Sequence, residues 1–314
     1  MIDPSTAGGR RLLFAILAAM LAVAPLVVYP TFLMKFMCFA LFACAYNLVA
    51  GYGGLLSFGH AIFFGGAAYV YAYLVKHGQW ALEPAVLAAM LIGAVLGLIV
   101  GIVAIRRQGI YVGMVTLALA QMFYFVCVQV PGTGGEDGIQ GIPRPDLLGW
   151  IPVTRDEVFY YVVLGVFLAG FAAVWRIVRS PFGEMLTAIR DNQSRAVSLG
   201  CEVGRYKLLA FVLSATLSAC AGAMFTATMG FASLNGVHWH LSGEVIMMAL
   251  IGGMGTMFGP VVGAAIVLVM QTYLAGIGQW VLVAQGVLFI VVVLFFRQGL
   301  IGALLARMDR RAAR

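Results

Sequence analysis

The chain has 314 residues, of which 63% are hydrophobic and only 10% are charged, and its mean hydropathy is +1.01. A soluble domain carries about 25% charged residues, so this composition excludes an ordinary soluble globular protein. The net charge of +7 comes mostly from arginine, and in a membrane protein such an excess marks cytoplasmic loops rather than a nucleic-acid surface.

Apolar segments of roughly membrane-spanning length follow one another along the chain, since a helix needs ~20 apolar residues to cross a bilayer. They are 12–29, 32–50, 60–75, 85–105, 109–130, 158–178, 206–230, 241–253, 259–276 and 280–296. Segments 60–75 and 241–253 are short, which is typical of broken or re-entrant helices. The sequence therefore predicts an all-α fold, a polytopic transmembrane helical bundle of about ten spans that forms a single domain over residues 1–314.

The first apolar run has two interpretations. Two arginines precede it and the triplet AVA at 22–24 ends it, as in a cleaved signal peptide, but Pro25 would follow the cleavage point. The run continues to Tyr29, which is long enough to cross a bilayer. We therefore favour an uncleaved first helix.

Basic residues near the ends of the segments predict the orientation, because they favour the cytoplasmic side. They gather at 10–11, 106–107, 176–207 and 307–314. Ten crossings place all four groups on one side, whereas nine crossings, with 241–276 as one span, would separate the termini. We expect ten spans with the N- and C-termini cytoplasmic. Loop 131–157, with five acidic residues and two arginines, is then extracytoplasmic and is expected to pack over the mouth of the bundle.

A first glycine-rich break interrupts the pattern at 47–60. Four glycines lie between 51 and 59, and Ser57 and His60 add hydrogen-bonding groups. One interpretation is an unwound segment that lines a solute path. The other is an ordinary turn in which His60 bonds to a neighbouring helix, and the sequence does not decide between them.

A second break contains Gly252, Gly253 and Gly255, followed by Pro260, and predicts a tight inward turn between two spans. Close packing of small residues is the alternative. Glu244 precedes this break at the start of an apolar run. It is a candidate for the solute path, unless Ser242 caps the helix and leaves Glu244 in the first turn near the positive end of the dipole.

The segment 179–207 combines charged and apolar residues. Pro181 predicts a helix start, with Glu184 in its first turn and Arg190 near its end, in agreement with the helix dipole. Apolar residues among these charges favour an amphipathic helix that docks into a groove of a soluble partner. A solvated loop with a positive charge excess is the alternative.

Motifs for catalysis are absent from the sequence. It contains no GxxxxGK[ST], HExxH or GxSxG string, and none of its five cysteines forms a CxxC pair. We therefore expect no enzyme activity, no catalytic residues and no metal site in this chain.

Several strings together resemble the LivM-type permeases of branched-chain (hydrophobic) amino acid ABC importers. They are GYGGLLSFGHAIFFGGAAY (51–69), TGGEDGIQGIP (133–143), SPFGEMLTAIRDNQSRAVSLG (180–200), RYKLLAFVLSA (205–215) and IGGMGTMFGPVVGA (251–264), and the resemblance extends over residues 40–300 in the same order.

The resemblance implies that 179–204 is the coupling loop that seats on an ATP-binding subunit, with Gly183, Glu184, Arg190, Ala196 and Gly200 as coupling residues. The family's loose EAA-x3-G pattern keeps its alanine and glycine here but lacks the first glutamate. The implied partners are a second homologous permease (LivH-like), two cytoplasmic ATPases that bind ATP and magnesium, and a periplasmic solute-binding protein. This chain would hold no cofactor and would lie in the bacterial inner membrane as a multi-pass protein.

Residues expected near the solute path are Ser57, His60, Glu244, Gly252, Gly253 and Gly255. The implied solutes are branched-chain or related hydrophobic amino acids, and relatives of this architecture also handle urea, short amides and aromatic acids. From a different class, an autonomous channel or ion-coupled carrier, or a structural scaffold, remains an alternative at this point.

Overall fold

The computed structural model describes residues 7–107, 109–147, 155–274, 276, 278, 280–295 and 299–302. The α-helices in these ranges are α1 (Ala7–Val23), α2 (Pro30–Asn47), α3 (His60–Gly78), α4 (Leu82–Ala104), α5 (Ile110–Gln129), α6 (Asp156–Val178), α7 (Pro181–Asp191), α8 (Gln193–Ser198), α9 (Val203–Met229), α10 (Trp239–Gly252), α11 (Gly259–Tyr273) and α12 (Trp280–Phe295). Short turns are η1 (Ala24–Leu26), the π-helical turn η2 (Leu48–Tyr52), η3 (Pro131–Thr133), η4 (Gly135–Asp137) and η5 (Leu234–Gly236).

Each predicted apolar segment coincides with one helix, so the expected all-α polytopic bundle is confirmed. Within the described residues, five helices are long and apolar enough to cross a membrane, namely α2 with η2, α4, α5, α6 and α9. Helices α10 and α11 are shorter apolar helices. The antiparallel pair β1 (Ile139–Gln140) and β2 (Phe231–Ala232) was not predicted, because two-residue strands far apart in the chain leave no periodic pattern.

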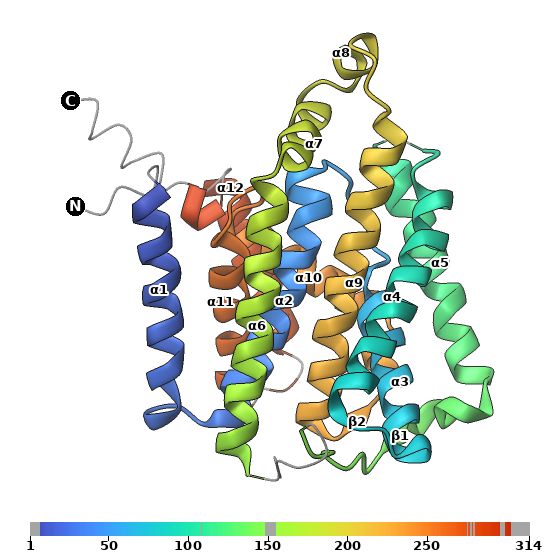
Figure 1. The fold of residues 1–314 in the computed structure, drawn as a ribbon, viewed down its shortest axis with the longest axis vertical. Helices are drawn as coiled ribbons and strands as arrows, with labels where there is room; N and C mark the ends of the chain where they lie inside the picture. Colours follow the sequence, from blue (N-terminus) through green and yellow to red (C-terminus); the bar gives the residue numbers. More distant parts are fainter. Residues whose placement is uncertain are drawn as a thin grey trace.

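Helices α2 and α9 form the centre of the bundle (Figure 1). Of the most apolar stretch of each span, 89% of the residues are buried in α2 with η2 and 67% in α9, against 33% in α4 and 28% in α5. Helices α3 and α4 pack on α9, while α6, α10 and α11 pack on α2. The outer helices therefore carry the surface that faces lipid.

The two ends of the bundle differ. Helices α7 and α8 project beyond one end, where α1 also begins, and β1 and β2 lie at the opposite end (Figure 1). We name these the α7–α8 end and the β1–β2 end. At the latter, Ile139 and Ile142 are buried, and Lys76 Nζ donates to the carbonyl oxygen of Gln140 at 2.6 Å. The described part of loop 131–157 therefore packs over the end of the bundle.

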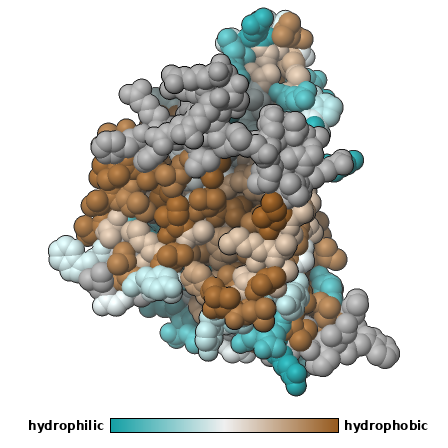
Figure 2. Space-filling model, turned by 90° about the vertical axis from the view of Figure 1, so that its left-hand side faces the viewer, coloured by the Kyte–Doolittle hydropathy of each residue, from teal (hydrophilic) through white to brown (hydrophobic). Residues whose placement is uncertain are grey.

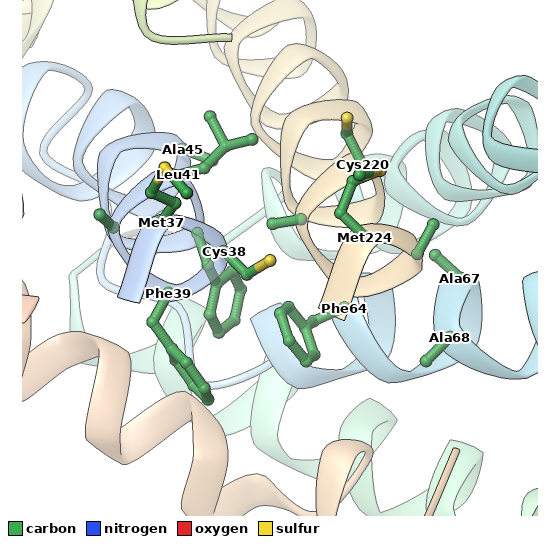
Figure 3. Packing of buried hydrophobic residues seen from close by; sticks show 14 of the residues in the cluster. Met37, Cys38, Phe39, Leu41, Ala45, Phe64, Ala67, Ala68, Cys220 and Met224 are labelled. Carbon is green, nitrogen blue, oxygen red and sulfur yellow. The ribbon is translucent and has the colours of Figure 1, made fainter. Parts of the chain in front are cut away.

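The core combines aromatic rings with small and sulfur-containing side chains (Figure 3). Phe39 of α2 and Phe64 of α3 stack with their ring centroids 5.7 Å apart, and Phe225 of α9 lies edge-on to Phe39 at 5.5 Å. Four of the five cysteines are buried and all five are free thiols, so they serve as packing residues.

Glycine brings α9 against α3. A Cβ on Gly222 would overlap the backbone of Phe64, so only glycine allows this approach, as is typical of helices in membranes. We expect Gly222→Ala to lower the free energy of unfolding by about 1–3 kcal/mol. Gly165→Ala, on α6 with open space around it, should change it by less than about 0.5 kcal/mol. Thermal unfolding in detergent measures both, and equal midpoints for the two variants would contradict this packing.

The outer surface is apolar across its middle. Figure 2 shows this on the side where α1 lies, with polar residues toward the two ends. Large exposed apolar side chains include Leu87 and Leu91 on α4, Met114 and Phe125 on α5, and Ile290 and Leu294 on α12. Such a surface suits hydrocarbon rather than water.

Candidate functional site

The two glycine-rich breaks meet near the α7–α8 end. Asn47, at the end of α2 and only 2% exposed, donates from Nδ2 to the carbonyl oxygen of Thr256 at 2.9 Å. Its Oδ1 accepts from the backbone nitrogen of Gly255, also at 2.9 Å. One amide side chain therefore joins η2 to the turn 253–258 between α10 and α11, and we call this contact the glycine junction.

Glycine is required on both sides of the junction. A Cβ on Gly51 would lie 2.5 Å from the backbone nitrogen of Gly255. Gly253 and Gly255 have φ angles of 119° and 77°, which favour glycine. A Cβ on Gly252 would overlap the carbonyl group of Gly259, so this glycine serves close packing of α10 on α11. The predicted tight turn is confirmed, and small-residue packing accompanies it.

Arg190 joins α7 to the glycine junction. Its Nη1 donates to the carbonyl oxygen of Gly51 at 2.6 Å, and its aliphatic part covers Gly54, where a Cβ would lie 2.7 Å from Arg190 Cγ. Asp191 Oδ1 accepts from Nε at 3.1 Å and from Nη2 at 2.9 Å. Arg190, which was expected to be a coupling residue, thus contacts the first glycine-rich break directly. The sequence did not predict this contact.

Ser57 and His60 belong to a buried hydrogen-bond network, and both are 0% exposed. His60 Nδ1 lies 3.1 Å from Ser57 Oγ and Nε2 lies 3.0 Å from Ser214 Oγ. Because Ser214 gives its own proton to the carbonyl oxygen of Ala45, it accepts from Nε2, which assigns the ring proton to that nitrogen. The network ties the start of α3 to α9 and α2, and the ring of His60 bonds to a neighbouring helix.

Ser214 and Ser218 offer a matched test of this network on α9. We expect Ser214→Ala to lower the free energy of unfolding by about 1–3 kcal/mol, because the Nε2–H group of His60 loses its acceptor. The hydroxyl of Ser218 is buried one turn away without a partner in the described ranges. Ser218→Ala should therefore change stability by less than about 0.5 kcal/mol, and equal losses in thermal unfolding would refute the assigned network.

Ser242 does not cap α10, so that expectation is wrong. Helix α10 begins at Trp239 with His238 as its N-cap, and Glu244 lies beyond its first turn. Ser242 Oγ instead accepts from the backbone nitrogen of Ala61 at 2.9 Å, and so satisfies the start of α3. The capping explanation of Glu244 therefore no longer holds.

Glu244 lines a pocket of about 510 Å³ at the β1–β2 end, between α2, α3, α9, α10 and α11. Its side chain is 17% exposed, and Oε1 lies 3.7 Å from His240 Nδ1. Lys35 and Gln271 also line this pocket. The residues of the glycine junction do not line this pocket, and neither do Ser57 and His60. The pocket is therefore separate from both.

The remaining predicted coupling residues shape the α6–α9 connection. Gly183 leaves no room for a Cβ beside the backbone of Val178, and Glu184 lies in the first turn of α7, as predicted. Ala196 is buried against α7, while Gly200 has a φ of 83° and open space around it. Together α7 and α8 form a compact projection, which we call the α7–α8 knob (residues 181–198).

This is a polytopic membrane protein whose interrupted helices meet at one end and are joined there to a projecting knob. The family model described as "Branched-chain amino acid transport system / permease component" matches residues 28–296. The chain belongs to this family of transport permeases.

Similar curated proteins include the high-affinity branched-chain amino acid transport system permease protein LivM of Salmonella typhimurium, 28% identical over 281 residues, which is 81% of this chain and 65% of that protein. The probable LivM of Methanocaldococcus jannaschii is 24% identical over 59% of this chain and 55% of its own length. The autoinducer 2 import system permease protein LsrC of Klebsiella pneumoniae is 29% identical over 55% of this chain and 50% of its own length. The chain thus spans 65% or less of these three relatives, and no solved structure matches it.

Proposed function

We propose that this chain is the permease subunit of an ATP-binding-cassette importer for branched-chain or related hydrophobic amino acids. The family match over residues 28–296 is the observation that carries the proposal. It works with a second, LivH-like permease, two cytoplasmic ATPases that bind ATP and magnesium, and a periplasmic binding protein. It crosses the bacterial inner membrane in ten spans with both termini cytoplasmic, so the α7–α8 end is cytoplasmic and the β1–β2 end is periplasmic.

The α7–α8 knob supports a docking role toward the ATPases. Val197 is 56% exposed at its tip and Leu199, directly after the knob, is 76% exposed, which leaves apolar side chains beyond the body of the bundle. At its base, Phe182 stacks on Tyr206 with a centroid distance of 5.7 Å. A knob held by its base and apolar at its tip suits seating in a groove on a soluble subunit.

The glycine junction supports a mechanism for coupling. Because Arg190 holds the carbonyl group of Gly51, a displacement of α7 acts on η2 and, through Asn47, on the turn between α10 and α11. These breaks are where regular α-helical hydrogen bonding stops, so they are the places that yield first. ATP-driven movement of the knob would then alternate access to the solute path, near which we place Ser57, His60, Glu244, Gly252, Gly253 and Gly255.

Two alternatives are tested by the same experiment. A permease of this family for another solute is favoured by the similarity to LsrC, whose name assigns it to autoinducer 2 import; urea, short amides and aromatic acids are further candidates. The second alternative is an autonomous channel or ion-coupled carrier.

Reconstitution into liposomes separates these functions. We expect leucine uptake only when both permeases, the ATPases, ATP and the binding protein are present together. Uptake by this chain alone would overturn the assignment as an importer subunit. ATP-dependent uptake of urea or autoinducer 2 without uptake of leucine would overturn the proposed solute class.

Gly200→Arg tests the coupling role of the segment after α8. A side chain there strains a backbone with a φ of 83° and adds bulk where the structure leaves open space. We expect the variant to insert into the membrane normally. Its transport rate and its capture of ATPase subunits should each fall at least about tenfold. Gly141→Arg, with a φ of 66° at the β1–β2 end, should keep that capture. Normal transport by the Gly200 variant would refute the role.

A further inference from the structure

We propose that the pocket lined by Glu244 is a transient binding site for a zwitterionic α-amino acid with an apolar side chain, in which Glu244 faces the ammonium group and Lys35 faces the carboxylate. The proposal rests on the proposed function and assigns a site in the permease itself. At about 510 Å³ the pocket is within the usual range of small-molecule sites, roughly 300–1,000 Å³.

The two charges face one pocket from different helices. Lys35 comes from α2 and Glu244 from α10, more than two hundred positions later in the chain. Ionisable side chains that face the interior of a helical membrane protein are rare and usually mark a solute or ion pathway. A positive and a negative group in the same pocket match the two charges of an amino acid.

Neither charge is fully satisfied inside the protein. Lys35 makes no hydrogen bond or ion pair with any residue that the structure describes, and only its charge acts on Glu244. Glu244 interacts with Gln271, but the imidazole of His240 lies at 3.7 Å, beyond hydrogen-bonding distance. Both groups thus retain capacity to bind a solute.

An aromatic wall completes the pocket. Phe39, Phe64 and Phe225 line it and pack on one another with centroid distances of 5.5–5.7 Å (Figure 3 shows the first two). Rings held by their mutual packing form a rigid apolar surface for an aliphatic side chain.

The chemistry of the pocket discriminates among solutes. Urea and short amides carry no charge for Lys35 or Glu244 and no apolar side chain for the aromatic wall. A carboxylic acid without an amino group would leave Glu244 facing no cation, and an amino acid amide would leave Lys35 unpaired. Only the zwitterion satisfies both, since an unpaired buried charge opposes binding.

Photo-leucine, a leucine analogue with a diazirine side chain, tests the site in the complete transporter in nanodiscs without the binding protein. We expect labelled peptides from α2, α3 or α10 around the pocket. Leucine should compete at least about tenfold better than leucinamide, 4-methylpentanoate or urea. Glu244→Gln and Lys35→Gln should each reduce labelling at least about fivefold, whereas Glu157→Gln, an exposed carboxylate at the same end, should leave it unchanged.

ATP-dependent leucine uptake by the same transporter, reconstituted in liposomes together with its binding protein, distinguishes failure of the site from failure of the proposed function. Normal uptake without labelling at the pocket, or equal competition by 4-methylpentanoate, would overturn the site while the proposed function stands. Absence of leucine uptake by the complete transporter would overturn the proposed function itself.

Discussion

Replacing Arg190 with alanine is expected to lower ATP-dependent uptake at least about tenfold. The substitution removes a charged donor from the partly buried carbonyl group of Gly51, and a bond of this kind contributes about 1.5–3 kcal/mol. Since 1.4 kcal/mol changes an equilibrium tenfold, its loss is enough to disconnect α7 from the glycine junction. Uptake into proteoliposomes measures the effect, and capture of the ATPase subunits shows whether the complex still assembles.

Arg205→Ala is the matched control. The side chain of Arg205 is 81% exposed and, among the described residues, pairs only with Glu202 one turn earlier, an interaction worth about 0–1 kcal/mol. Uptake by this variant should stay within about twofold of the unmodified protein. If uptake by the Arg190→Ala variant also stayed within that range, the proposal that Arg190 transmits movement of α7 to the glycine junction would be refuted.

Asn47→Asp is expected to have the largest effect on stability. The aspartate keeps the shape of the side chain and the acceptor for Gly255, but it replaces the donor to Thr256 with a buried carboxylate that faces a carbonyl oxygen. An uncompensated buried charge of this kind costs about 3–5 kcal/mol. At neutral pH we expect a lower midpoint of thermal unfolding in detergent and a loss of uptake of at least about tenfold.

Asn192→Asp is the matched control. It makes the same chemical change at a side chain of which only the carbonyl oxygen, as an acceptor, is used in the described structure. Asn192 Oδ1 caps α8 by accepting from the backbone nitrogen of Arg195, and aspartate caps a helix about as well as asparagine. This variant should unfold within about 0.5 kcal/mol of the unmodified protein. Equal stability of the two variants would show that Asn47 does not hold the junction.

Local patterns in the sequence were sufficient to predict the helices of the bundle, their breaks and the start of α7, but not the separate short helix α8. The need for apolar length in a bilayer makes each span visible, and the glycines at 51–54 and 252–255 indicate where helices cannot continue. The start of α7 at Pro181 followed from the fixed φ of proline. These features depend only on residues that are neighbours in the sequence.

Contacts between distant segments could not be predicted in this way. Asn47 and Gly255 are 208 positions apart, and neither end carries a local sign of its partner. Ser242 illustrates the same limit, because its hydroxyl could serve its own helix or another one, and tertiary packing directs it to Ala61. A single amide inside the apolar run 32–50 was the one available signal for Asn47, since buried polar groups require partners.

Site-specific photocrosslinking from position 199 tests most directly whether this chain couples to an ATPase. Leu199 is 76% exposed next to the α7–α8 knob, so a photoreactive side chain there should not disturb the bundle. In the assembled transporter it should crosslink to an ATP-binding subunit, whereas the same group at Gly141, at the opposite end, should not. Crosslinks to the ATPase from position 141 and none from position 199 would contradict the proposed orientation and coupling.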